Sequence, residues 1–184
     1  LQKGQFGMAY EFCYQNEAVK IGDKYKLGYG ESLGKMIYDE SFRAETLQSI
    51  GKKQSGTGFE FPEVSILAKC FEKKVPFTVH VGIGTDVIDQ HKGFDGGAKG
   101  AASGRDFLIY VKEITKLTEG GVVLNIGSAV TGPEVFLKAV SMASNAGLQP
   151  SGIMTADFDI REHKPEEMVD EGSQCYYFRD QKSI

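Results

Sequence analysis

Three apolar stretches of the chain each end in small or acidic residues, and chemistry is expected at these ends. Residues 75–83 lead into Gly84-Thr85-Asp86, and residues 122–126 lead into Gly127-Ser128. A third stretch leads through Ile153 and Met154 into Thr155-Ala156-Asp157. Apolar, β-branched runs of this kind are typical of buried parallel strands, which deliver their carboxyl ends to a ligand crevice. The three ends predict one site that is assembled from several loops.

The strongest single motif runs from Asn125 to Glu134. Gly127 and small hydroxyl residues follow the second apolar run, and Pro133-Glu134 then starts a helical pattern. A helix N-terminus offers free N–H groups and the positive end of a dipole to a phosphate. The motif predicts an anion-binding turn, although a turn that needs glycine only for its backbone conformation gives the same pattern. Gly82-x-Gly84 is weaker, because it lacks the G-x-G-x-x-G spacing.

Candidates for acid–base chemistry are few. His91 lies in a glycine-rich segment, while Glu134 and Asp159 are the other titratable candidates for catalysis. Asp157 and Asp159 lie nearest the expected crevice, where a carboxylate can bind ribose hydroxyls or an amine. His80, inside an apolar run, fits a core position better than a catalytic one. The His and Cys residues show no metal-site spacing, so no metal is expected.

Composition limits the classes of function. The net charge of −4 argues against a nucleic-acid surface, which needs a basic patch. No apolar run approaches the roughly 20 residues of a membrane span. Three widely spaced cysteines form neither a disulfide framework nor a zinc motif, so a cytoplasmic location is expected. The chain opens at Leu1 without a Met and stops after a strand pattern, which suggests an excerpt of a longer protein.

The elements that must position these residues follow from periodicity. We expect helices at 5–20, 30–39, 63–74, 104–117 and 133–146, loops at 51–62 and 90–104, and strands at 76–83, 122–127, 151–156 and 174–179. Strands that alternate with helices predict a single α/β domain with a Rossmann-like, doubly wound, mainly parallel sheet. Within it, residues 1–49 form a helical N-terminal part and residues 50–184 a nucleotide-binding core.

From Ile50 onward the chain resembles deoxyhypusine synthase. The resemblance is carried by short motifs in the same order: Ile50-Gly51-Lys52, Pro62-Glu63-Val64-Ser65-Ile66, Lys74-Val75-Pro76-Phe77, Gly84-Thr85-Asp86-Val87-Ile88-Asp89, the strand from Gly121 to Gly127, Thr155-Ala156 and Phe178-Arg179-Asp180-Gln181. Before residue 50, Phe6-Gly7-Met8-Ala9 and the stretch from Gly28 to Gly34 are similar to a bacterial branch of the same superfamily.

The resemblance implies a Rossmann-like NAD-binding fold in a homo-oligomer, usually a homotetramer with its sites between subunits. It places the following residues around NAD: Gly84, Thr85, Asp86, Gly127, Ser128, Thr155, Ala156 and Asp180. Glu167 lies where the family uses an acid to hold spermidine, and Asp157 and Asp159 are expected to assist in holding a substrate.

The chain departs from the family at the catalytic lysine. The family reads Trp-Gly-Lys at the step where this chain reads Glu171-Gly172-Ser173. Serine cannot form the imine that carries the aminobutyl group. We therefore expect a protein that binds NAD or another nucleotide and acts on a small amine or related metabolite without forming hypusine. The alternative is a non-catalytic oligomeric module that binds a nucleotide or another anion.

Overall fold

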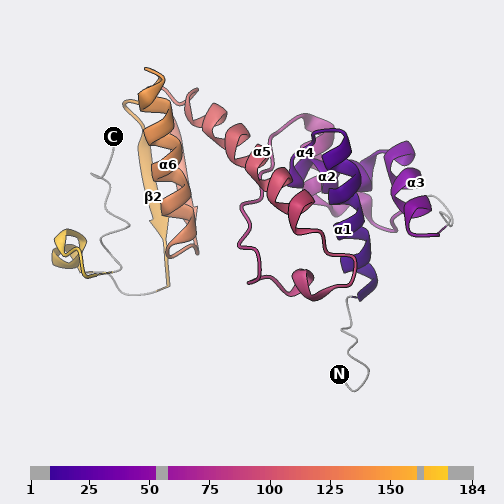
Figure 1. The fold of residues 1–184 in the computed structure, drawn as a ribbon. Helices are drawn as coiled ribbons and strands as arrows, with labels where there is room; N and C mark the ends of the chain where they lie inside the picture. The colour runs from indigo at the N-terminus through magenta and orange to yellow at the C-terminus, as the bar shows by residue number, and fades with distance from the viewer. Residues whose placement is uncertain (1–8, 53–57, 161–163, 174–184) are drawn as a thin grey trace. The chain divides into compact units, whose positions relative to one another are not determined.

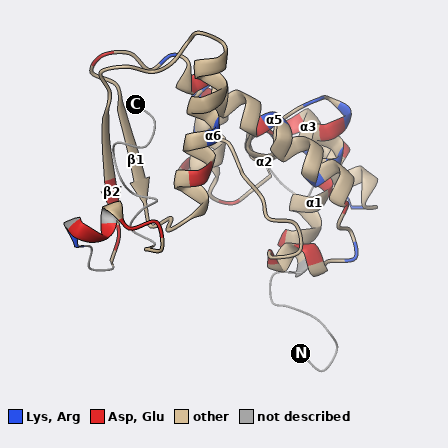
Figure 2. Cartoon of the chain, turned by 60° about the vertical axis from the view of Figure 1, so that its left-hand side comes forward, with Lys and Arg blue, Asp and Glu red and all other residues tan. Residues whose placement is uncertain are grey.

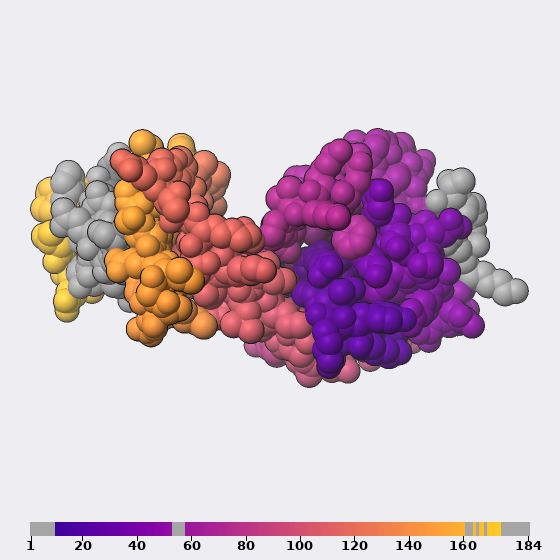
Figure 3. Space-filling model, turned by 90° about the horizontal axis from the view of Figure 1, so that it is seen from above, coloured from indigo at the N-terminus to yellow at the C-terminus, as the bar shows by residue number. Residues whose placement is uncertain are grey.

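A computed structural model describes residues 9–52, 58–160 and 164–173 (Figure 1). The Cα positions divide the chain into two compact units, Leu1–Ile109 and Tyr110–Ile184 (Figure 3). We call them unit 1 and unit 2. The boundary between Ile109 and Tyr110 lies inside a helix.

Unit 1 is built from helices. They are α1 (Ala9–Lys24), α2 (Tyr29–Tyr38), α3 (Glu40–Ser49), α4 (Ile66–Lys73) and the first part of α5 (Gly96–Ile114), with the short 3₁₀ helices η1 (Pro62–Val64) and η2 (Val87–Gln90). Ala18, Ile21, Met36 and Phe42 form one cluster of its core. Gly34 allows α2 and α4 to approach closely, because an added Cβ would lie 2.6 Å from the carbonyl oxygen of Leu67.

Local signals explain the helices that the sequence predicted correctly. Ser65 begins α4 by accepting a hydrogen bond from the Ala68 N–H at 3.2 Å, and Pro62 starts η1 just before it. Helix α2 matches the predicted range 30–39, whereas α1 ends at Lys24 instead of residue 20. Helix α3 was not predicted. Its Asp39 cap, bonded to the Phe42 N–H at 2.8 Å, is a start signal that the sequence does contain.

The predicted glycine-rich loop at 90–104 is wrong from Gly96 onward, where α5 begins. Asp95 accepts a hydrogen bond from the Ala98 N–H at 2.9 Å and so caps the first turn. Ala98 and Ala102 are buried, one helical turn apart. The small residues of this segment therefore serve close helix packing and not a mobile loop.

The predicted strand at 76–83 is also wrong, because this segment pairs with no strand among the residues that the structure describes. The N–H of Val79 donates to Asp106 at 2.8 Å, and that of Val81 donates to Ser103 Oγ at 3.1 Å. The Ser103 hydroxyl donates in turn to the Val79 carbonyl oxygen at 2.7 Å. Side chains of α5 thus take the backbone groups that a neighbouring strand would use.

Unit 2 holds a small β–α–β arrangement. Strand β1 (Val122–Ile126) leads into α6 (Thr131–Asn145) and then β2 (Met154–Phe158), and η3 (Pro165–Val169) follows. The strands pair in parallel, from Val122 opposite Met154 to Ile126 opposite Phe158. The predictions of strand 122–127 and helix 133–146 are confirmed within two residues. The strand predicted at 151–156 begins later, at Met154.

The predicted doubly wound, mainly parallel Rossmann-like sheet is wrong. Across the described part of the chain, the sheet contains two strands, β1 and β2, and helices supply most of the structure. The strand predicted at 174–179 lies outside the described residues. None of the helices that the structure describes is long and apolar enough to cross a membrane.

Candidate functional site

The turn after β1 lies directly at the carboxyl end of the sheet. Gly127 has a φ of +68°, a conformation that favours glycine, and its N–H donates to the Phe158 carbonyl oxygen at 2.9 Å. The Ser128 hydroxyl oxygen accepts a hydrogen bond from the Gly132 N–H at 2.7 Å. These two bonds tie the turn to the end of β2 on one side and to the start of α6 on the other.

Asn125 joins the same turn to an acid on the neighbouring strand. The register places Asn125 opposite Asp157, and its Nδ2 donates both to Asp157 Oδ1 and, at 2.8 Å, to the Ser128 carbonyl oxygen. A Cβ at Gly132 would lie 2.5 Å from Asn125 Oδ1, so the close approach of α6 needs a glycine there. The ends of both strands and the start of α6 therefore meet around one exposed carboxylate.

The start of α6 offers fewer hydrogen-bond donors than its sequence motif predicted. The Gly132 N–H is already bonded to Ser128, and Pro133 has no N–H. Glu134 adds a carboxylate to the first turn and forms an ion pair with Lys138, one turn further along. The carboxylate of Asp157, which can accept hydrogen bonds from hydroxyl groups, is thus the clearer binding group of unit 2.

The predicted residues Gly84, Thr85 and Asp86 lie in unit 1, in an exposed loop just before η2. Gly84 has a φ of +89°, and its N–H donates to Asp89 Oδ2 at 2.8 Å. The Thr85 hydroxyl donates to the Gly82 carbonyl oxygen at 2.7 Å. The loop therefore satisfies several of its own polar groups.

Sequence reasoning missed the buried lysine beneath this loop. Lys99, on α5, is almost fully buried and pairs with Asp89, and its Nζ lies 3.4 Å from Asp86 Oδ2. Burial alone would raise the pKa of Asp89, but hydrogen bonds from Lys99 and Gly84 outweigh it and lower that pKa. Burial and the charges of the two aspartates raise the pKa of Tyr29 to about 12. No local pattern in the sequence marked Lys99 as a residue that points inward.

The candidates for catalysis belong to both units. His91 belongs to unit 1, where its Nδ1 accepts a hydrogen bond from the Gly93 N–H at 3.0 Å. Glu134 is paired with Lys138, and Asp159 directly follows β2 in unit 2. The described residues contain no group of three or more His, Cys, Asp or Glu side chains suited to a metal ion.

The remaining predicted site residues belong to β2 and to the chain that follows it in the sequence. Thr155 and Ala156 lie within β2, opposite Val123 and Leu124, and not beyond the strand's end. Glu167 lies in η3, and Asp180 is outside the described residues. Acidic residues are frequent on η3 and at the end of β2 (Figure 2). Asp157 is the penultimate residue of β2, and Asp159 and Glu167 follow the end of that strand in the sequence.

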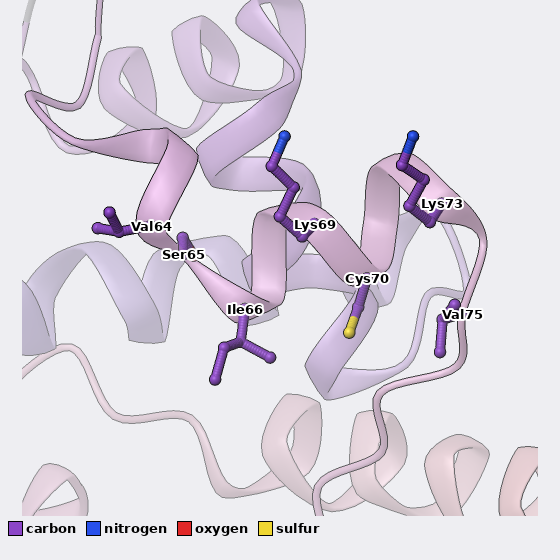
Figure 4. A pocket seen from close by; sticks show the side chains of 7 residues that line it. All are labelled: Val64, Ser65, Ile66, Lys69, Cys70, Lys73 and Val75. Carbon is purple, nitrogen blue, oxygen red and sulfur yellow. The ribbon is translucent and has the colours of Figure 1, made fainter.

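A hollow of about 300 Å³ lies on α4 of unit 1, and none of the predicted site residues lines it. Figure 4 shows its lining: Val64, Ser65, Ile66, Lys69, Cys70, Lys73 and Val75. The amino groups of the two lysines point away from Ile66 and Cys70 (Figure 4) and lie 2.7 and 3.6 Å from Glu72. Because these cations are engaged with Glu72 and do not converge on the apolar floor, the hollow has no polar group that would orient a ligand.

No family model, curated protein or solved structure matches this chain. The resemblance to deoxyhypusine synthase stays a prediction, so function rests on the geometry of unit 2.

Proposed function

We propose that the chain binds a nucleotide at the carboxyl end of the β1–β2 sheet. The observation that carries this proposal is the contact of Asn125 with Asp157, which brings an exposed carboxylate to the turn between β1 and α6. Ligands of parallel α/β units bind beyond the carboxyl ends of the strands, and an acid near the carboxyl end of the second strand, as Asp157 is in β2, can bind ribose hydroxyls there. Asp157 holds the ribose, and the turn at Gly127 and Ser128 faces the phosphates.

Asn125 holds the Asp157 carboxylate in position for ribose binding. Its Nδ2 bonds to Asp157 Oδ1 and to the Ser128 carbonyl, so the acid and the turn have a defined spacing before a ligand arrives. A preorganised carboxylate loses less conformational entropy when it accepts hydroxyl hydrogen bonds. NAD is the nucleotide that the sequence resemblance favours, and its ribose hydroxyls suit this acid.

An enzymatic role extends the same proposal. NAD, when bound, would supply a hydride acceptor for the oxidation of a small amine to an imine, and Asp159 or Glu167 would hold an ammonium group of the substrate. The alternative, a module that binds the nucleotide without catalysis, is supported by one observation: Glu134 is engaged in an ion pair with Lys138. Formation of NADH from NAD with a panel of amines would favour the enzyme, and binding of NAD without turnover would favour the module.

Calorimetric titration with NAD tests the binding proposal. Asp157→Asn keeps an oxygen that can accept from Asn125 but removes the charge, so hydrogen bonds to the ribose weaken by about 1–3 kcal/mol, or roughly 10–100-fold in affinity. Asp170→Asn, the same change at an exposed acid of unit 2, should leave affinity unchanged. Equal affinities of wild type and Asp157→Asn for NAD would refute the site.

A further inference from the structure

One face of the β1–β2 sheet is open and apolar. Alternate residues of a strand point to opposite faces, so every second side chain of each strand shares a face. On one face these side chains are large and apolar, and each is more than half exposed: Val122, Leu124, Ile126, Met154 and Phe158. No charged residue occupies this face within either strand. A contiguous apolar patch of this kind marks an interaction surface.

The opposite face of the sheet is covered by α6. Asn125 points to that face, since a Cβ at Gly132 on α6 would meet its Oδ1. Ala139, Val140 and Ala143 of α6 are buried, and the helix runs alongside the strands (Figures 1 and 2). Parallel sheets occur almost only with both faces covered. Among the described residues of unit 2, α6 covers one face of the sheet and the other face stays exposed.

We propose that a second copy of this chain covers the open face, with the two β1–β2 sheets packed face to face about a twofold axis. Such an axis places the same patch on both sides of the interface, which requires a surface that is complementary to itself. A surface without charges meets this condition, because no like charges are brought together. The aligned packing of two sheets is a common arrangement in β-sandwiches.

The size of the patch suits a dimer. Five side chains that are more than half exposed present an area of roughly 500 Å² per copy, in the range of functional patches on protein surfaces. Two copies would bury about 1,000 Å² together, which reaches the lower limit for a specific interface. A weak dimer that forms at micromolar concentration is therefore expected.

Two other occupants fit the face less well. The segment 174–179 is predicted to be a strand, and a strand pairs with the edge of a sheet and does not cover its face. The apolar hollow on α4 of unit 1 is bordered by Lys69 and Lys73. Packing these lysines against an uncharged sheet would remove them from water without a new partner.

Light scattering on the size-separated full chain tests the proposal. Leu124→Glu places a charge at the centre of the open face and should convert the dimer to a monomer with an unchanged circular dichroism spectrum. Val64→Glu is the matched control, since Val64 is an exposed apolar residue of the α4 hollow, and this variant should remain a dimer. A monomeric wild type, or a dimer that only Val64→Glu disrupts, would overturn the proposal.

Methionine oxidation of the wild-type chain keeps the test valid if Leu124→Glu fails to fold. Met154 lies on the open face, and Met142 is exposed on α6. With dilute peroxide and mass spectrometry, oxidation of Met154 should slow by roughly threefold or more as the protein concentration rises, while that of Met142 stays constant. A constant ratio of the two rates at all concentrations would contradict a dimer through this face.

Discussion

Asp106 is the residue that connects the elements of unit 1. Its Oδ2 accepts hydrogen bonds from the Gly30 N–H at 3.0 Å and the Val79 N–H at 2.8 Å, so α5 holds both the start of α2 and the segment after α4. Burial raises the pKa of Asp106, and these backbone hydrogen bonds oppose that rise. A Cβ at Gly28 would lie 1.8 Å from Oδ1, so this buried acid also requires a glycine beside it.

Substitution of Asp106 tests how much these two hydrogen bonds contribute to the stability of unit 1. Asp106→Ala leaves the buried Gly30 N–H and the partly buried Val79 N–H without this acceptor, and we expect a loss of about 2–4 kcal/mol in the free energy of unfolding by urea. Asp106→Asn is the control, because its side-chain oxygen still accepts, and it should lose less. Equal stabilities of wild type and Asp106→Ala would show that the two hydrogen bonds contribute nothing.

The Asp106→Asn variant also tests whether the pKa of Asp106 is raised. Because the pKa of Asp106 is raised in the folded state, its contribution to stability is fully present below the usual aspartate pKa and is lost as pH rises through the raised value. The asparagine side chain of Asp106→Asn has no group that titrates between these two pKa values. The melting temperature of the wild type relative to this variant should therefore fall as pH increases over that interval, and a constant difference would speak against a raised pKa.

At the scale of elements, α5 decides how unit 1 is organised. Its first half carries glycines that would suit a loop, yet it forms a continuous helix whose side chains Ser103 and Asp106 hold residues 79–81. Gly104 has no atom within 4 Å of the position an added Cβ would occupy. In such an exposed helical position glycine costs conformational entropy without a packing reason.

A pair of glycine substitutions separates a helix from a loop. Gly104→Ala should raise the free energy of unfolding by about 0.5–1 kcal/mol, because alanine is the better helix former. Gly34→Ala in α2 should lower it by about 1–3 kcal/mol, since the new methyl group would press on the Leu67 carbonyl. Denaturant titrations give both values. A loss of stability in Gly104→Ala would argue against a helix at this position.

At the scale of the whole molecule, the predicted NAD-binding residues belong to two compact units. Gly84, Thr85 and Asp86 lie in unit 1, and Gly127 and Ser128 lie in unit 2. The loop of unit 1 is held by internal contacts, with the Gly84 N–H on Asp89 and Lys99 beneath both acids. The turn of unit 2 instead leads to an exposed carboxylate. These differences favour unit 2 as the nucleotide site.

Hydrogen exchange of the full chain with and without NAD tests this division. We expect slower exchange for the amides of residues 127–131 and no change for those of residues 84–86. An excess of inorganic phosphate in place of NAD is the control for a non-specific anion effect. Protection of both segments by NAD would instead support the single site, assembled from several loops, that the sequence predicts.

Local patterns in the sequence determined much of the secondary structure. Apolar spacing predicted α2, apolar spacing together with a proline near the start predicted α4 and α6, and a short β-branched run predicted β1. These elements follow from residues that are close together in the chain, where periodicity and caps act directly. The same patterns predicted that Asp157 and the turn at Gly127 and Ser128 belong to a binding site.

The tertiary structure decided the rest, because the deciding partners are far apart in sequence. Residues 76–83 have the composition of a buried strand, but whether they join a sheet depends on which groups form hydrogen bonds with the backbone of Val79 and Val81. Side chains of α5 form these hydrogen bonds, both as acceptors and as donors. Lys99 was unremarkable in the sequence until folding placed it on Asp89. The partnership of Asn125 and Asp157 depends on the register of β1 with β2, which no local pattern encodes.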